Sequence, residues 1–466
     1  MKTILGSWQA GVKTRWFSCV IVCVWSVSTC AFPQAEDWLQ FRGTNGTGIS
    51  TGKPHPTEWS EDTNVAWKIK VPGVAWSQPV DWGNRIYLTT AVADEQPRPQ
   101  KGETGPGFSL FSVEGLTKTF GDGGSPPNTI YQWKLLCLDL DSGDLFWERT
   151  IRESAPTIPT HRSNSYASET PATDGKHIYI CIAMAGLYCV DMEGNPVWNR
   201  TIDARPMQIG WGTGSSPVIY EGCVFLQCDN EKDSFLSAFG SETGDELWSV
   251  ERDEDSNWST PWIWQNDKRT ELVTCGGKKV RSYDMRSGQV LWEVDANGRT
   301  ATTAVGDTER VFVGSVSRSM GSSADLQAIR AGASGDLSKN DQTSFSAWKV
   351  PRAAPQLASP LLHEGCLYTL QQFGGIVNCF DADTGRRHYR QRLPGGSGFT
   401  ASPWAVGNHV FCLDESGQTF VLETGPEFKL TATNKLDGMF WSSAAVADQK
   451  LLLRSVDHLY CIAEPR

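Results

Sequence analysis

The stretch SETGDELWSV (residues 241–250) predicts a tight turn at Thr243 and Gly244, followed by a short strand that carries Trp248. Glycine permits the positive φ that such a turn requires, and the alternating residues after it are typical of a strand. Closely related phrases, each ending on an aromatic residue, recur at residues 141–147, 193–198, 286–292 and 383–389. A phrase that returns at intervals of this size indicates a repeat fold.

Each repeat also begins with a short opener, usually Ser or Thr before Pro, and an alternating apolar run follows it. The Pro or Ala of the eight openers is found at Pro79, Pro171, Pro217, Pro261, Ala304, Pro360, Pro403 and Ala444. From Pro171 onward, successive openers are 46, 44, 43, 56, 43 and 41 residues apart. Together with a third apolar run and the turn phrase, each unit predicts a four-stranded antiparallel blade, and no long window shows helical periodicity.

We expect the blades to close into a ring, because closure removes the open sheet edges that a row of blades would leave. The last unit supplies only three strands, whereas NVAWKIKV (residues 64–71) precedes the first opener as an unmatched strand with Trp67. These two parts fit together as one split blade. The sequence therefore predicts an all-β fold, an eight-bladed β-propeller over residues 64–464 whose last blade is closed by the N-terminal strand.

The opener, the apolar strand and the phrase D-x-x-T-G-x-x-x-W together resemble the pyrroloquinoline-quinone (PQQ) repeat family, the quinoprotein-like propellers that include BamB-like repeats. DWLQFRGTNGTGIS (residues 37–50) and NSYASETPATDGKHIY (residues 164–179) are similar to exported PQQ-like propeller proteins of planctomycete-type bacteria. The resemblance implies that the repeated aromatic residues dock between neighbouring blades. The residues that match this position are Trp67, Trp147, Trp198, Trp248, Trp292 and Trp348, with Tyr389 and Phe428 as weaker counterparts.

Residues 1–31 are predicted to be a secretory signal peptide, because basic residues precede the uncharged run WFSCVIVCVWSVSTCAF (residues 16–32). This run is short for an uncleaved anchor, and Thr29 departs from the pattern that precedes a lipidated cysteine such as Cys30. We therefore expect a monomer exported to the periplasm or the extracellular side of the envelope, without a lipid anchor or a transmembrane segment. A lead segment at residues 32–63 precedes the propeller, and insertions are expected at residues 91–130, 152–167 and 315–346.

The formal net charge is −11, and it becomes −14 without residues 1–31, which hold three basic residues and no acidic one. This acidic balance argues against nucleic acid and anionic lipid as partners. Ten of the 13 cysteines lie after residue 31, and several occupy equivalent positions in different repeats, too far apart to bridge. We expect cysteine to act chiefly as a small buried apolar residue, and whether any disulfide forms stays open.

The motifs of enzymes are missing from the sequence. Quinone-using relatives resemble one another in an adjacent cysteine pair, and none of the 13 cysteines here neighbours another. There is no C-x-x-C-H haem motif, no G-x-S-x-G elbow and no H-E-x-x-H zinc motif. The charge-rich segments DNEKDS (residues 229–234) and ERDEDS (residues 251–256) are predicted to be a solvated turn and a solvated linker rather than metal sites.

The main hypothesis is accordingly an exported, non-catalytic propeller that serves as a binding or assembly scaffold in the cell envelope. We expect no catalytic residue, no metal site and no cofactor, and an envelope protein or peptide as the partner. The alternative is an enzyme, either a dehydrogenase that uses PQQ with calcium or an enzyme that uses its insertion loops.

Two groups of residues are candidates for partner binding. The residues three before the Pro or Ala of each opener should line one mouth of the central channel, where bulky rings either plug it or form an aromatic floor. The bulky residues at this position are Trp76, Trp258 and Trp441. The lengthened loop between the first two blades either binds an anionic or carbonyl-bearing partner or packs on itself. Its candidate residues are His161, Arg162, Asn164 and Tyr166.

Overall fold

The computed structural model describes residues 37–99, 125–161, 163–296, 298–314, 325–339 and 343–464, all within the compact unit Ala35–Arg466. The predicted signal peptide, Arg162 and most of the first expected insertion lie outside these residues. Within the described ranges, no helix is both long enough and apolar enough to cross a bilayer.

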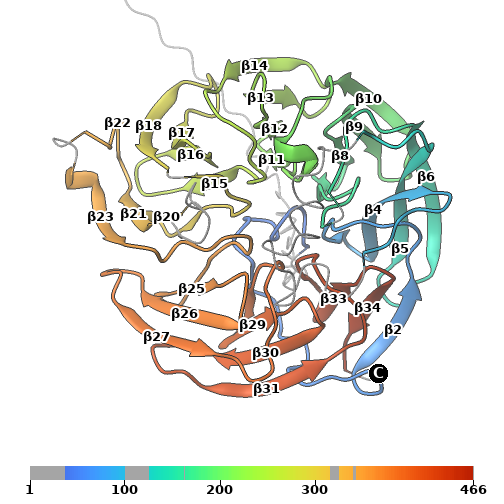
Figure 1. Ribbon diagram of the computed structural model, residues 1–466. Coiled ribbons are helices and arrows are strands. Elements are labelled where there is room, and N and C mark those ends of the chain that lie inside the picture. The colour runs from blue at the N-terminus through green and yellow to red at the C-terminus, as the bar shows by residue number, and fades with distance from the viewer. Residues whose placement is uncertain are drawn as a thin grey trace, which may run out of the picture. The chain divides into compact units, whose positions relative to one another are not determined.

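The described residues form eight sheets arranged as a ring (Figure 1). Blade 1 comprises β3 (Val80–Trp82), β4 (Arg85–Ala93), β5 (Tyr131–Asp139) and β6 (Leu145–Ser154). Blade 2 comprises β7 (Ala172–Thr173), β8 (His177–Ile182), β9 (Gly186–Asp191) and β10 (Pro196–Thr201). Blade 3 comprises β11 (Val218–Tyr220), β12 (Cys223–Cys228), β13 (Phe235–Gly240) and β14 (Glu246–Glu251). Blade 4 comprises β15 (Trp262–Gln265), β16 (Thr270–Cys275), β17 (Lys279–Tyr283) and β18 (Val290–Asp295).

The second half of the ring repeats this order. Blade 5 comprises β19 (Val305–Gly306), β20 (Arg310–Val313), β21 (Leu326–Arg330) and β23 (Ser346–Val350). Blade 6 comprises β24 (Leu361–His363), β25 (Cys366–Leu370), β26 (Ile376–Asp381) and β27 (Arg387–Arg392). Blade 7 comprises β28 (Trp404–Val406), β29 (His409–Leu413), β30 (Gln418–Glu423) and β31 (Leu430–Lys435). Blade 8 comprises β32 (Ala445–Ala447), β33 (Lys450–Arg454), β34 (His458–Ile462) and β2 (Val65–Lys70).

The predicted fold and its closure are confirmed, since the strand from the start of the chain completes the last blade. Strand β2 pairs antiparallel with β34, with Trp67 opposite Cys461 and Lys70 opposite His458. This pairing covers the outer edge of β34 and gives the last blade its fourth strand, which closes the ring.

Two sheets carry a short fifth strand that the repeat pattern does not predict. Strand β1 (Ile49–Ser50) runs parallel to β28, and β22 (Gly335–Asp336) runs parallel to β18 of the preceding blade. The expected insertion at residues 315–346 contains β21, so its extra residues lie on both sides of a regular blade strand. Two short 3₁₀ turns are also present, η1 (Gln208–Gly210) and η2 (Thr343–Phe345).

The recurring turn phrase has a steric explanation, because the tryptophan of one blade lies against the turn glycine of the next. A Cβ atom on Gly244, whose φ is +69°, would lie 2.5 Å from the ring of Trp198 in the preceding blade. Only glycine therefore permits both the turn and the close approach of the ring. The same contact joins Trp67 to Gly143, Trp147 to Gly194, Trp248 to Gly288 and Trp348 to Gly385.

Trp292 departs from this arrangement. Its Nε1 donates a hydrogen bond to the Glu271 carboxylate of its own blade at 2.7 Å. The Nε1 atoms of Trp67, Trp198, Trp248 and Trp348 instead donate to backbone carbonyls of the next blade. The blade 4 to blade 5 junction is therefore joined by different contacts, among them a bond from Trp264 Nε1 to Asp307 O at 2.7 Å.

The Ser or Thr of the openers joins neighbouring blades around the channel. Its hydroxyl accepts a hydrogen bond from the backbone N–H of the equivalent residue in the preceding blade, which satisfies a buried donor. Such bonds of 2.9–3.0 Å run from Gln78 to Thr170, Thr170 to Ser216, Ser216 to Thr260, Thr303 to Ser359, Ser359 to Ser402 and Ser402 to Ser443. Gln78 replaces the hydroxyl residue in blade 1, and its Nε2 donates to Ala444 O in blade 8.

The lead segment (residues 37–63) lies across one mouth of the channel and belongs to the packed ring (Figure 1, blue). Trp38 N–H donates to the Asp81 carboxylate at 3.0 Å, and Asp81 N–H donates back to Trp38 O at 3.1 Å. Further bonds to blades 2, 3, 4, 6 and 7 run from Thr173 N to Leu39 O, Ile219 N to Gln40 Oε1, Trp262 Nε1 to Asn45 O, Arg42 Nη2 to Pro360 O and Ala405 N to Gly48 O.

We call the side that carries this segment the lead face, and the opposite side, which carries the connections at residues 155–161, 163–171 and 202–217, the loop face.

Arg42 of the lead segment is buried against the ring. Its N–H donates to Gln78 Oε1 at 2.8 Å, and its Nη2 donates to Pro360 O at 2.7 Å, so it links blades 1 and 6. Complete burial lowers its pKa to about 9.

The two charge-rich segments are solvated only in part. Glu231, Lys232 and Asp233 are exposed, as predicted, whereas Asp229, Arg252 and Glu254 are buried. The Asp229 carboxylate accepts a bidentate hydrogen bond from Arg252 Nε and Nη2 at 2.7 and 3.1 Å, and both side chains are fully buried. Glu254 accepts bonds from Lys278 N–H and from Arg281 Nη1. The segments are charged because they form an internal network between blades 3 and 4.

The ten cysteines of the described residues are all free, and eight of them are buried. Most lie on the second and third strands of the blades, where they fill small spaces in the core. This placement agrees with a role as a small apolar residue.

Candidate functional site

The loop-face mouth of the channel brings two of the three predicted tryptophans together. Trp76 and Trp441, from blades 1 and 8, lie with their ring centroids 4.9 Å apart. With Met439 and Val456 they form a small apolar cluster separate from the main cores. The indole Nε1 atoms of both tryptophans are buried without a hydrogen-bond partner in the described structure. Both side chains are buried, so the pair is an apolar plug with two unpaired donors rather than an open aromatic surface.

A second aromatic pair lies on the other side of the ring. Trp258, which follows blade 3, lies 5.6 Å from Trp211, and its Nε1 donates to Gly212 O at 2.7 Å. The imidazole of His161 lies 6.4 Å from Trp211 in an edge-on orientation. All three rings are partly exposed. The mouth thus has two aromatic patches on opposite sides, contributed by four blade junctions.

The loop before blade 2 is held firmly against this second patch. Asn164 Nδ2 donates to Trp211 O and to Thr213 O, each at 2.8 Å. The backbone N–H of Asn164 donates to His161 O. His161 therefore stays beside Trp211 at the surface, and Asn164 uses its amide to fix the loop rather than to face a partner.

Tyr166 is buried in the core of blade 1 and is not accessible to a partner. Its hydroxyl donates to Ile158 O at 3.2 Å, and its ring lies 4.9 Å from Tyr131. Trp133 Nε1 donates to Tyr166 O at 2.7 Å. The loop therefore packs on itself and on blade 1. Of its three candidate residues that the structure describes, His161 is the one whose ring lies beside the aromatic pair at the surface of the mouth, and Arg162 lies outside the described residues.

A buried carboxyl group follows the opener position that Trp76 and Trp441 occupy in their own repeats. Glu169 occupies the opener position at which the other repeats have Ser, Thr or Ala. It is 4% exposed, and its Oε1 has no hydrogen-bond partner in the described structure. Burial raises the pKa of Glu169 to about 7, and hydrogen bonding from Thr213 opposes this shift in part.

A buried guanidinium contacts Ser77, the residue that follows Trp76 and occupies the opener position equivalent to Glu169. Arg454 Nη1 donates to Ser77 Oγ at 2.7 Å, to Ser77 O at 3.1 Å and to Thr89 O at 2.9 Å. These acceptors are neutral, and complete burial lowers the pKa of Arg454 to about 9, so the group keeps its positive charge at neutral pH. The wall beneath the mouth therefore holds one fixed cation and one carboxyl that titrates near neutrality.

The Glu169→Gln variant is expected to match the parent protein in stability near pH 4.5 and to exceed it by about 3 kcal/mol above pH 8. The folded state binds the Glu169 proton more tightly than the unfolded state, so the parent loses stability as pH rises from 4.5 to about 7. Urea unfolding of both proteins across this range measures the difference. The exposed control Glu246→Gln should show no such trend, and a flat difference for Glu169→Gln would contradict the assignment.

The channel residues do not fit a quinone held by calcium. Calcium prefers six to eight oxygen ligands, several of them carboxylates. Among the described residues, no three His, Cys, Asp or Glu side chains are grouped so that they could hold a metal. Glu169 is also the only acidic residue at its level of the openers, and Arg454 is already bound to neutral oxygens.

Three residues of this site were not among those predicted from the sequence. Glu169 had a signal, since ETPA breaks the Ser, Thr or Ala pattern of the openers. Trp211 and Arg454 had none, because they lie on a connection and on a regular strand whose position in the channel depends on the assembled ring.

A family profile described as outer membrane protein assembly factor BamB matches residues 133–326, from β5 of blade 1 to β21 of blade 5. No curated protein sequence matches the chain significantly. The repeats of the matched segment are thus of the BamB-like, PQQ-repeat type that the sequence predicts.

Solved structures share the architecture at low sequence identity. The quinohemoprotein alcohol dehydrogenase of Comamonas testosteroni has a TM-score of 0.57 and 9% identity, over 92% of this chain and 81% of that one. A europium-containing methanol dehydrogenase has a TM-score of 0.56 and 10% identity, over 91% and 90% of the two chains. BamB of Moraxella catarrhalis has a TM-score of 0.48 and 11% identity, over 80% and 98%. At these identities, the two dehydrogenases show the fold alone.

Proposed function

We propose that this protein is an exported, non-catalytic propeller that serves as a binding or assembly scaffold in the cell envelope, and that an envelope protein or peptide docks at the loop-face mouth. The observation that carries the proposal is the difference between the two mouths. The lead segment covers one mouth with hydrogen bonds to blades 1, 2, 3, 4, 6 and 7, whereas the described part of the other mouth holds the partly exposed pair of Trp211 and Trp258.

The physical character of the loop-face mouth suits a protein partner. Tryptophan is the residue type most enriched in the energetic centres of protein interfaces, and partly exposed rings offer area at small entropic cost. The rings that are accessible to such a partner are those of Trp211, Trp258 and His161, because Trp76 and Trp441 are buried. The match of residues 133–326 to the family of an outer-membrane assembly factor supports an envelope role.

We propose further that the protein works without a cofactor. The donor set in the channel does not fit a calcium-bound quinone, as described above. The likeness to dehydrogenases concerns the architecture and carries no residue of a quinone site to this chain. The predicted signal peptide at residues 1–31 supports export on the basis of its sequence.

A photo-crosslinking amino acid placed at position 211 tests the proposal in the cells that produce the protein. We expect a discrete protein adduct from Trp211, which is partly exposed at the mouth, and none from the matched position Leu247, which is 56% exposed on an outer strand. The Trp258→Ala substitution should reduce the adduct at position 211, because it removes the ring that packs beside it.

An adduct from Leu247 alone would show that the partner uses another surface, and no adduct from either position would overturn the scaffold proposal. The purified protein should also melt at the same temperature with and without added PQQ and calcium. A rise in melting temperature that saturates with PQQ would favour the dehydrogenase alternative.

A further inference from the structure

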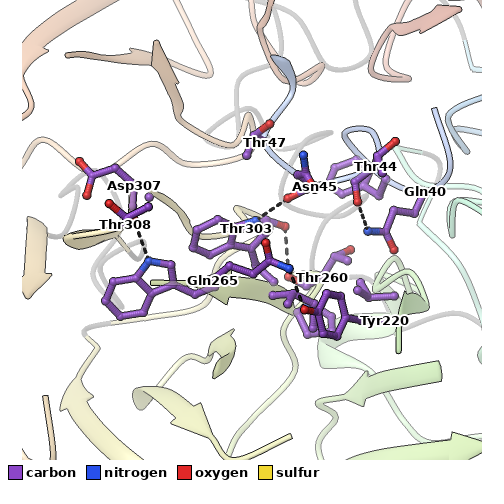
Figure 2. A pocket seen from close by; sticks show the side chains of 18 residues that line it. Gln40, Thr44, Asn45, Thr47, Tyr220, Thr260, Gln265, Thr303, Asp307 and Thr308 are labelled. Atoms are coloured by element: carbon purple, nitrogen blue, oxygen red, sulfur yellow. Dashed lines mark hydrogen bonds between the residues drawn. The ribbon is translucent and has the colours of Figure 1, made fainter. Parts of the chain in front are cut away.

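A separate cavity lies on the lead face, away from the tryptophan mouth. It has a volume of about 190 Å³ and lies between the lead segment and the inner strands of blades 3, 4 and 5 (Figure 2). Residues 40–47 of the lead segment form one wall, and strands β11 and β15 with the turn after β19 form the other. The cavity therefore exists only because the lead segment is docked on the ring.

The walls combine aromatic rings with amide and hydroxyl groups. Phe41, Tyr220 and Trp262 supply the aromatic surface. Asn45, Gln265 and Thr308 are exposed at its rim and supply polar atoms (Figure 2). An apolar wall with a few fixed polar groups is the usual composition of a small-molecule site.

Charge narrows the class of ligand. Of the residues that line the cavity, Asp307 is the only one with a charged side chain. Its carboxylate accepts hydrogen bonds from the N–H groups of Glu309 and Arg310 at 2.8 and 2.6 Å and forms an ion pair with the Arg310 guanidinium. Because the Asp307 charge is already compensated, the cavity has no free charged group to bind a phosphate or a divalent cation, and it suits an uncharged ligand.

Two hydrogen bonds across the cavity hold the Trp262 ring and the Gln265 amide in place. Trp262 Nε1 donates to Asn45 O at 2.9 Å, which ties blade 4 to the lead segment (Figure 2). Gln265 Nε2 donates to the Tyr220 hydroxyl at 2.7 Å, which ties blade 4 to blade 3. A site whose groups are fixed before binding loses little conformational entropy when a ligand enters.

We propose that this cavity binds one neutral hexopyranose unit of a glycan. A cavity of about 150 Å³ accommodates a benzene ring, so 190 Å³ admits a single six-membered ring with its substituents directed to the rim. The C–H faces of a pyranose can pack against the partly exposed rings of Phe41 and Tyr220. Its hydroxyl groups can both donate and accept, which matches the amides of Asn45 and Gln265.

Calorimetric titration of the mature chain with the methyl glycosides of glucose, galactose, mannose and N-acetylglucosamine tests this proposal. We expect at least one of them to bind with a Kd of about 1 mM, as is reasonable for one ring in a small site. Asn45→Ala and Gln265→Ala should each weaken that glycoside about fivefold or more, since each removes one hydrogen-bonding amide. Both residues are exposed at the rim, so neither substitution creates a cavity in the core.

Two controls make the outcome decisive. Gln391→Ala, on the exposed outer strand of blade 6, should bind the glycoside as the parent does. Glucuronate and inorganic phosphate should bind more weakly than the neutral glycosides. The proposal is overturned if no glycoside binds, if the Asn45 and Gln265 variants bind as tightly as the parent, or if the anions bind as well as the neutral sugars. None of these results depends on the partner proposed for the loop face.

Discussion

A chain that begins at residue 72 is expected to lose cooperative unfolding and to aggregate. This truncation removes β2, whose residues pair with β34 from Val65 opposite Ile462 to Lys70 opposite His458. It also removes the ring of Trp67, which is 9% exposed and packs against the turn glycine Gly143 of blade 1. Loss of one large buried aromatic costs about 3–5 kcal/mol, and the open edge of β34 adds to this cost.

The total stability of a globular domain is about 5–15 kcal/mol, so the truncated chain should keep little of it. Thermal unfolding by circular dichroism and sedimentation analysis measure the result. A chain that begins at residue 64 is the comparison, since it keeps β2 but also lacks the lead segment, whose Trp38 and Trp59 are buried in the core. Both chains should be destabilised, and the chain that begins at residue 72 should be the less stable of the two by the contribution of β2. A cooperative transition for the shorter chain close to that of the full protein would contradict ring closure by β2.

The blade number and the closure could be predicted because every blade repeats one local solution. The Trp198 ring and Gly244 show why: the turn needs a positive φ, and the neighbouring indole leaves no room for a Cβ. Both demands act on residues at fixed spacing, so they leave a periodic trace in the sequence. The opener hydroxyls leave a similar trace, because each accepts a bond from the same position of the preceding blade.

The lead segment has no periodic pattern in the sequence, and its packing against the blades was not predicted. Trp38 and Arg42 have partners such as Asp81 and Pro360 that are distant in sequence and belong to different blades. His55 is likewise buried, accepts a hydrogen bond from Trp404 Nε1 at 3.2 Å and has a pKa lowered to about 4 by burial. Contacts of this kind form only in the assembled ring, so no local sequence pattern predicts them.

The residues at the loop-face mouth also differ in how far the repeat pattern could predict their positions. The repeat register placed Trp76 and Trp441 in adjacent blades, and the structure brings their rings to 4.9 Å. The same register could not show that the Asn164 amide donates hydrogen bonds to Trp211 O and Thr213 O, or that Tyr166 is buried. Loop residues are positioned by contacts with other loops, which no periodicity specifies.

The Arg252→Ala variant is expected to lose about 3–5 kcal/mol of unfolding free energy, because it leaves the Asp229 carboxylate buried without its cation. Arg252 Nη1 also donates to the Thr274 hydroxyl at 2.7 Å and to the Tyr283 hydroxyl at 2.6 Å. Both side chains of the pair are completely excluded from solvent, so water cannot replace the lost partner. Urea unfolding at pH 7 gives the difference in unfolding free energy.

The double variant Arg252→Met with Asp229→Leu separates the loss of the pair from the cost of an unpaired charge. It should recover most of the stability, because apolar side chains of similar volume replace a buried ion pair with little penalty. Lys176→Ala breaks an ion pair whose side chains are 64% and 58% exposed, and it should cost less than about 1 kcal/mol. If Arg252→Ala cost no more than Lys176→Ala, the segment at residues 251–256 would behave as the solvated linker that its charge pattern predicts, and the buried network would not stabilise the junction between blades 3 and 4.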